Sequence, residues 1–155
     1  MRSKITPLVV GIGLSIAGCA DIVPTISIDP PVESNSPELI EEATAFGDWQ
    51  LPADARVLRV RSENLRDPNF RLAIETSPDG LSWMLDKSRY SEPLEKGMPV
   101  HPEKIIAGPP LATSPSVKVS QDLFVSQEGD SMIRAVVVDE RTPELRIVHL
   151  QFRGQ

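Results

Sequence analysis

The sequence predicts one small α+β domain, a mainly antiparallel sheet of four or five strands with one helix packed on it. Three observations support this fold class. Apolar and polar residues alternate in two separate regions, which predicts two β-hairpins. A capped helical pattern lies between the regions, and no repeat or second core-forming region extends the chain of 155 residues. We therefore assign residues 46–155 to this domain and residues 19–45 to a disordered linker before it.

The first hairpin is expected between about Ala55 and Glu75. Alternation with a period of two places one set of side chains on an apolar face. This face is expected to carry Leu58, Val60, Phe70, Leu72 and Ile74. The charged residues between them, such as Arg59, Arg61 and Arg71, would then lie in water and pair across the strands.

The predicted helix begins after Ser77. Serine is a favourable N-cap, Pro78 suits the first helical position, and Asp79 lies near the positive end of the helix dipole. The apolar stripe of Leu81, Met84 and Leu85 is expected to pack on the apolar face of the first hairpin.

The linker contains a second, shorter helical signal. Ser36 could cap a helical turn or two that ends near Ala45, with acidic residues in its first turn. Prolines and the absence of a sustained period favour an extended linker instead. We therefore expect a disordered linker here, and we expect the folded domain to begin near Phe46 and Trp49.

The second hairpin contains a strand that is apolar on both faces. Met132, Val136 and Val138 alternate with a second apolar set, which includes Ile133 and Val137. Such strands are normally covered on both sides, and one helix can cover only one. The cover for the other face would be the proline-rich segment 91–115 or something outside the chain.

This second face offers two functional hypotheses. The first is a groove for a partner protein or an apolar ligand, walled by Ile133, Val137, Ile147 and the proline-rich segment. The second is a weak metal site or acid–base pair formed by His101 and His149, with help from Glu103. Two unrelated histidines are the simpler interpretation, so we predict no metal, no cofactor and no catalytic residue.

The first residues of the chain have the pattern of an export signal. Arg2 and Lys4 precede an apolar run from Ile5 to Ile16, and the small residues Ala17 and Gly18 follow. The apolar run is too short to cross a bilayer, which needs about 20 residues. We therefore predict a signal peptide at residues 1–18, cleaved between Gly18 and Cys19.

The sequence Leu14-Ser15-Ile16-Ala17-Gly18-Cys19 resembles the lipobox of bacterial lipoproteins. This resemblance implies that the Cys19 thiol receives a diacylglycerol and that the new amino group is often acylated. Two or three acyl chains hold a protein on a membrane far more firmly than one. The protein would then be anchored in the cell membrane or the outer membrane, on its extracytoplasmic face.

Composition excludes several functions. The single cysteine rules out an internal disulfide, and residues 20–54 carry eight carboxylates with no lysine or arginine. The rest of the chain after the leader has fourteen residues of each sign, so no basic footprint for nucleic acid is expected. The common catalytic and nucleotide-binding motifs are also missing from the sequence.

The mature region resembles the small uncharacterised lipoproteins of bacterial envelopes, in phrases such as Leu51-Pro52-Ala53-Asp54-Ala55 and Ala107-Gly108-Pro109-Pro110. This resemblance implies no activity. We expect a non-enzymatic interaction or accessory module of the envelope. The alternative is an envelope enzyme or weak metal-binding protein that uses His101 and His149.

Overall fold

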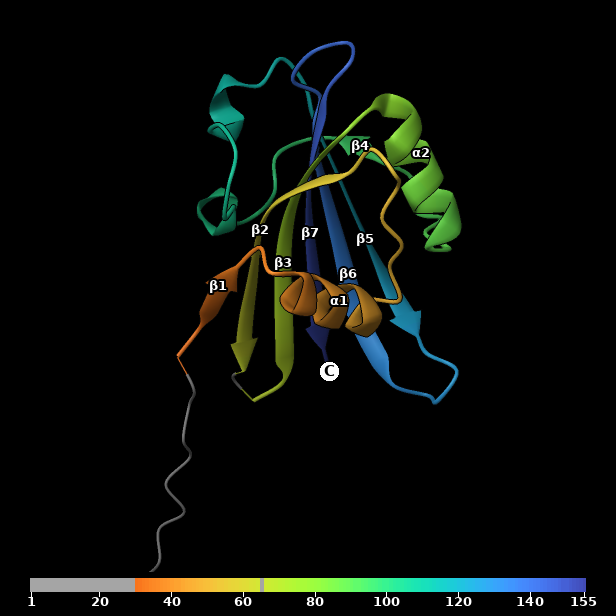
Figure 1. Cartoon of the computed structure of the whole chain (residues 1–155). Helices are drawn as coiled ribbons and strands as arrows, with labels where there is room; N and C mark the ends of the chain where they lie inside the picture. The colour runs from red at the N-terminus through yellow and green to blue at the C-terminus, as the bar shows by residue number, and fades with distance from the viewer. Residues whose placement is uncertain (1–29, 65) are drawn as a thin grey trace, which may run out of the picture.

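The computed structural model describes residues 30–64 and 66–155. These residues form one antiparallel sheet of seven strands, in the order β1-β2-β3-β7-β6-β5-β4 (Figure 1). The strands are β1 (Val32–Ser34), β2 (Arg56–Asn64), β3 (Pro68–Thr76), β4 (Glu95–Lys96), β5 (Val117–Val125), β6 (Ser131–Asp139) and β7 (Arg146–Gly154). The predicted signal peptide, Gly18 and Cys19 lie outside the described residues.

Two α-helices, α1 (Pro37–Phe46) and α2 (Pro78–Lys87), lie on the same face of the sheet (Figure 1). We call this the front face. The opposite, or back, face is approached by the proline-rich segment between α2 and β5, which contains the short 3₁₀ helices η1 (Pro102–Lys104) and η2 (Leu111–Thr113). No helix of the described residues is long and apolar enough to cross a membrane.

The predicted fold class is wrong in the number of strands and helices. The sheet has seven strands instead of four or five, and two helices pack on it instead of one. The extra helix, α1, and the edge strand β1 lie in the segment expected to be disordered linker. Four of the five long strands, β2, β3, β6 and β7, come from the two predicted hairpins, which join through antiparallel pairing of β3 with β7.

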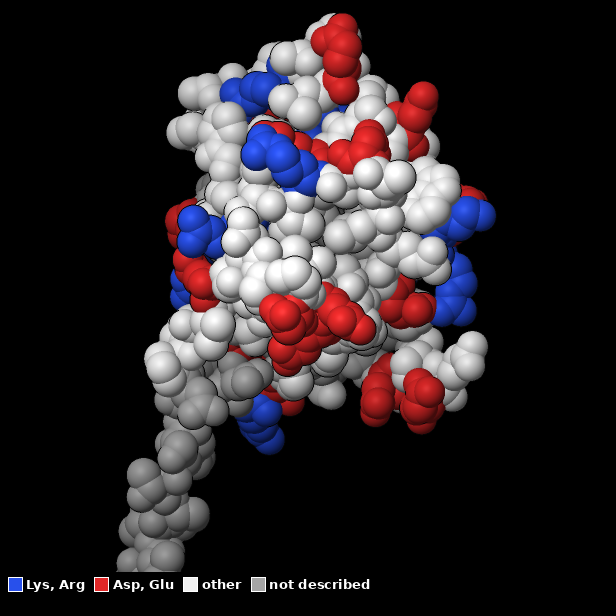
Figure 2. Space-filling model, viewed as in Figure 1, with Lys and Arg blue, Asp and Glu red and all other residues white. Residues whose placement is uncertain are grey.

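Helix α1 is ordered because it has both a cap and a buried face. The Ser36 hydroxyl accepts a hydrogen bond from the Leu39 amide at 3.4 Å, as the shorter helical signal required. Leu39 and Ala43 are buried against the front face. The acidic residues Glu38, Glu41 and Glu42 remain exposed, and Figure 2 shows acidic side chains gathered over this helix. Tertiary packing therefore outweighs the linker-like composition.

A close approach fixes the end of α1 on the sheet. A Cβ atom added at Gly47 would lie only 2.4 Å from the Phe152 ring, so a side chain here would displace the ring from the core. Trp49 follows and packs against Phe152, with 5.5 Å between ring centroids. The first aromatic residues of the domain thus close one end of the front core.

Helix α2 confirms the helix predicted after Ser77. Ser77 caps it by accepting from the Gly80 amide at 3.0 Å, and Leu81 and Met84 are buried in the front core. Strand β2 has a register irregularity between Val57 and Arg59. Because of it, Val57 packs on the front core together with Val60, in the place expected for Leu58.

The front core contains a charged residue that the apolar pattern of β6 concealed. Arg134 is fully buried, with 0% of its surface exposed. Its guanidinium lies 4.1 Å from the centroid of the Phe124 ring and forms a salt bridge with Asp122 on the neighbouring strand. It also donates to the Ser88 carbonyl at 2.9 Å, at the C-terminal end of α2. Arg134 therefore joins the sheet to the negative end of this helix.

We predict that Arg134→Met destabilises the domain by about 3 kcal/mol, because it leaves the Asp122 carboxylate and the α2 carbonyl without their donor. Urea unfolding measures this loss. The double variant Arg134→Met with Asp122→Leu should regain part of the stability, since the unpaired carboxylate is removed with its partner. A loss below about 1 kcal/mol, or a double variant no more stable than the single one, would contradict this role for Arg134.

Candidate functional site: a pocket on the back face

The back face of β3, β7, β6 and β5 forms the floor of a pocket of about 580 Å³. Strand pairing arranges the floor in rows. The inner row contains His149, Val137 and Val119, and the middle row contains Arg71, Gln151, Ala135 and Gln121. Arg153 and Ile133 form the outer row. Ala135 lies between Gln151 and Gln121, and its small side chain makes the middle of the floor lower than its sides.

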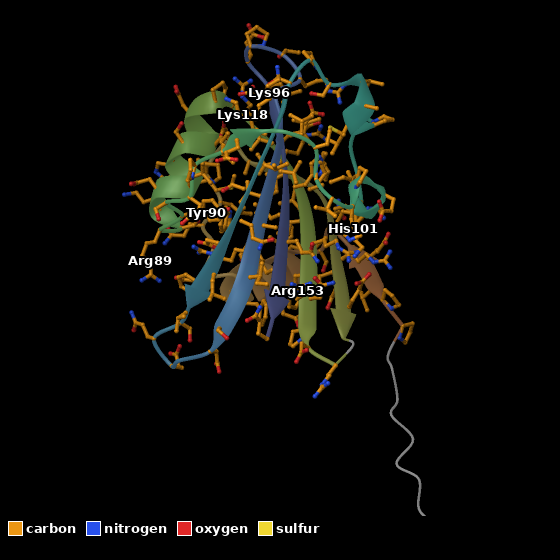
Figure 3. The ribbon with its side chains drawn as sticks, turned by 180° about the vertical axis from the view of Figure 1, so that it is seen from behind. Arg89, Tyr90, Lys96, His101, Lys118 and Arg153 are labelled. Carbon is orange, nitrogen blue, oxygen red and sulfur yellow. The ribbon has the colours of Figure 1, made fainter. Side chains whose placement is uncertain are left out.

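The proline-rich segment forms the roof of the pocket. Its lining residues are mainly apolar: Met98, Pro99, Val100, Ile105 and Ile106. Two of them are unusually exposed, since Met98 is 50% and Val100 is 90% accessible. Figure 3 looks onto this face and labels Arg153 on the sheet and His101 beside η1. The volume falls in the range of small-molecule sites, which is roughly 300–1,000 Å³.

Buried hydrogen bonds hold the far end of the roof on the sheet. The Asp139 carboxylate is fully buried at the end of β6, accepts from the Ser114 hydroxyl, and pairs with Arg141. Arg141 also donates to the Thr113 hydroxyl at 2.8 Å. Leu111 packs on Val117 and Val137 in a separate small core. The end of the segment nearest β5 is therefore fixed.

Gly108 covers the inner end of the pocket. It adopts a φ of +93°, which favours glycine, and a Cβ atom placed there would lie 3.4 Å from Ile147 and 3.7 Å from the His149 ring. Ile147 is consequently buried under the roof and does not line the pocket. Of the predicted groove residues, Ile133 and Val137 line the pocket and Ile147 lies beyond its inner end.

His149 is buried without a hydrogen-bond partner. Only 5% of the residue is exposed, and neither ring nitrogen has a partner among the described residues. Desolvation lowers the pKa of its imidazole to about 4, although the nearby Asp139 carboxylate acts in the opposite direction. The ring is therefore neutral at neutral pH, and it presents one donor and one acceptor.

His101 and His149 line the same pocket but differ in environment. The Nδ1 atom of His101 lies 3.0 Å from the Glu103 carboxylate, and both side chains are mostly exposed. A backbone hydrogen bond, and to a smaller extent this contact with His101, lowers the pKa of Glu103. The nearby Asp139 carboxylate is held by Ser114 and Arg141. The described residues contain no cluster of three or more metal-ligating side chains.

No family model, curated protein or solved structure matches this chain. We therefore infer function from the pocket itself.

Several lining residues were missed by the sequence analysis. Alternation already places Gln151 on the same face as His149, and Arg153 continues that series. Arg71 was assigned to a solvated face of the first hairpin, yet its side chain is only 13% exposed. Its burial follows from the pairing of β3 with β7, which brings Arg71 opposite Gln151. Sequence periodicity within one hairpin does not reveal this long-range pairing.

We predict that His149 makes the domain less stable as the pH falls from about 6.5 toward about 4. In this window the unfolded chain binds a proton at His149 and the folded chain does not, so protonation favours unfolding. The full effect is about 3 kcal/mol. Urea unfolding at several pH values, compared with His149→Leu, isolates it from the titration of carboxylates. A stability difference between the two chains that stays constant over this window would contradict a buried neutral imidazole.

Proposed function

We propose that this chain is a lipid-anchored extracytoplasmic protein whose domain binds a small ligand in the back-face pocket without catalysing a reaction. The observation that carries the binding function is the pocket: about 580 Å³ between an apolar roof and a floor with a few polar groups. The lipobox pattern around Cys19 supports the anchor. The domain would then serve as an accessory module of the cell envelope.

The arrangement of polar groups supports binding over catalysis. Within the described residues, His149 has no hydrogen bond to a hydroxyl that it could activate as a nucleophile. The exposed His101 contacts Glu103 and not His149. The alternative, an enzyme or weak metal site that uses both histidines, is supported by one observation, namely that both line the same pocket.

The anchor can be tested through Cys19. When the chain is expressed in a bacterial host, we expect the unchanged protein in the membrane fraction and the Cys19→Ser variant in the soluble extracytoplasmic fraction, because the variant lacks the acylated thiol. Mass spectrometry of the mature N-terminus should show the diacylglycerol on Cys19. A Cys19→Ser variant that stays on the membrane after export, or an unmodified mature cysteine, would overturn the anchor.

The pocket can be tested by filling it. We predict that Nile red, a neutral apolar dye, becomes fluorescent with the Cys19→Ser chain, and that Ala135→Phe in this chain reduces its binding at least about fivefold by occupying the pocket floor. The control is Ala45→Phe on α1, which adds a phenyl ring to the exposed front surface. Absence of dye binding, or equal loss in both variants, would contradict a ligand pocket. The metal alternative would be favoured by a different result: zinc releases or absorbs heat when titrated into the Cys19→Ser chain, and this heat disappears when His149→Leu is added.

A further inference from the structure

We infer that the pocket takes a small monocarboxylate with an apolar body, of the chemical class of medium-chain fatty acids. This inference rests on the proposed binding function and specifies its ligand. It is carried by the distribution of charge around the pocket and by the position of the apolar lining residues. The carboxylate would lie over β3 and β7, and the apolar body would lie on β6 and β5 under the proline-rich roof.

The basic and acidic residues of the pocket lie on opposite sides. Arg71 and Arg153 line the pocket from β3 and β7 and Lys104 lines it from η1, whereas Glu95 belongs to β4 at the other edge of the sheet and Glu92 shortly precedes β4. Between β7 and β4 lie two strands, so these charges are separated by about 14 Å across the sheet. An anion over β3 and β7 therefore lies close to the cations and far from Glu95.

The cations on this side have unused hydrogen-bonding capacity. Arg71 donates from Nη1 to Glu63 at 3.2 Å, but its buried Nε has no partner among the described residues. Arg153 and Lys104 have no carboxylate within salt-bridge distance in the described part of the chain. Arg71 is the least exposed of the charged residues that line the pocket, and its charge is paired with Glu63. A bound carboxylate would accept from the exposed Arg153 and Lys104, whereas the Arg71 Nε is buried and lies out of its reach.

The remaining lining fits an apolar chain. Ala135, Val137 and Val119 lie on the floor and Ile106 lines the roof, with Gln121 beside Ala135 as the polar group on this side. His149 at the inner end is uncharged at neutral pH, so it does not attract a second charge there. A dicarboxylate would place its second negative charge against these apolar groups or near Glu95, which disfavours it.

Isothermal titration of octanoate and 1-octanol against the Cys19→Ser chain tests the ligand class without competing detergent. We expect octanoate to bind at least about tenfold more tightly than the alcohol, because only the acid gains charge-assisted hydrogen bonds. Arg153→Gln combined with Lys104→Gln should remove most of this preference, and added salt should weaken it. Lys87→Gln on the front-face helix α2 is the matched control and should leave it unchanged.

The outcomes separate the ligand class from the pocket. The shift of the Ala135 methyl resonance on titration reports whether binding occurs at the floor. If acid and alcohol bind equally and Ala135→Phe blocks both, the carboxylate inference is wrong and the proposed binding function stands. If the Ala135 methyl responds to neither compound and Nile red also fails to bind, both proposals are wrong.

Discussion

The structure depends on covering both faces of the central strands β6 and β7. Val136, Val138 and Leu150 are buried on the front, and Val137 and Ile147 are buried on the back. Leaving either set in water would cost about 1.5–3 kcal/mol for each large side chain. The two helices and the residues that follow them, such as Trp49 and Tyr90, cover the front core, whereas the proline-rich segment covers only part of the back. The pocket is the part of the back face that this segment spans without filling.

The two covers are attached in different ways. On the front, Arg134 links the sheet to the end of α2 through the Ser88 carbonyl, and aromatic rings enclose its guanidinium. On the back, a buried carboxylate, Asp139, holds the segment through Ser114 and Arg141. Both attachments use charged groups inside apolar surroundings, where they are costly unless paired. The segment is held near its start by β4, which pairs with β5, and near its end by Asp139, so its middle part, with exposed Met98 and Val100, lies above an open floor.

Much of the architecture was predictable from local patterns, and long-range pairing was not. Alternation identified the long strands, and Ser77 with Pro78 identified α2, because these signals lie within a few residues of each other. Helix α1 was misjudged because its short apolar stripe becomes favourable only when the sheet buries it. Arg134 was overlooked because its burial depends on Asp122 and Phe124, which belong to another strand. The doubly apolar β6 predicted a second face that needs cover, and Ile133 and Val137 of this face line the pocket, but the cations of the pocket depend on the pairing of β3 with β7.

The partial cover of the back face can be tested most directly by the access of a small neutral nitroxide to methyl groups on the two faces of the sheet. Paramagnetic broadening should be strong for Ala135 on the pocket floor and weak for Val136 in the front core and Ile147 beneath Gly108. Equal protection of Ala135 and Val136 would show that the proline-rich segment fills the back face. Strong broadening of Ile147 would show that this segment does not cover the sheet. Either result would contradict a half-covered sheet as the origin of the pocket.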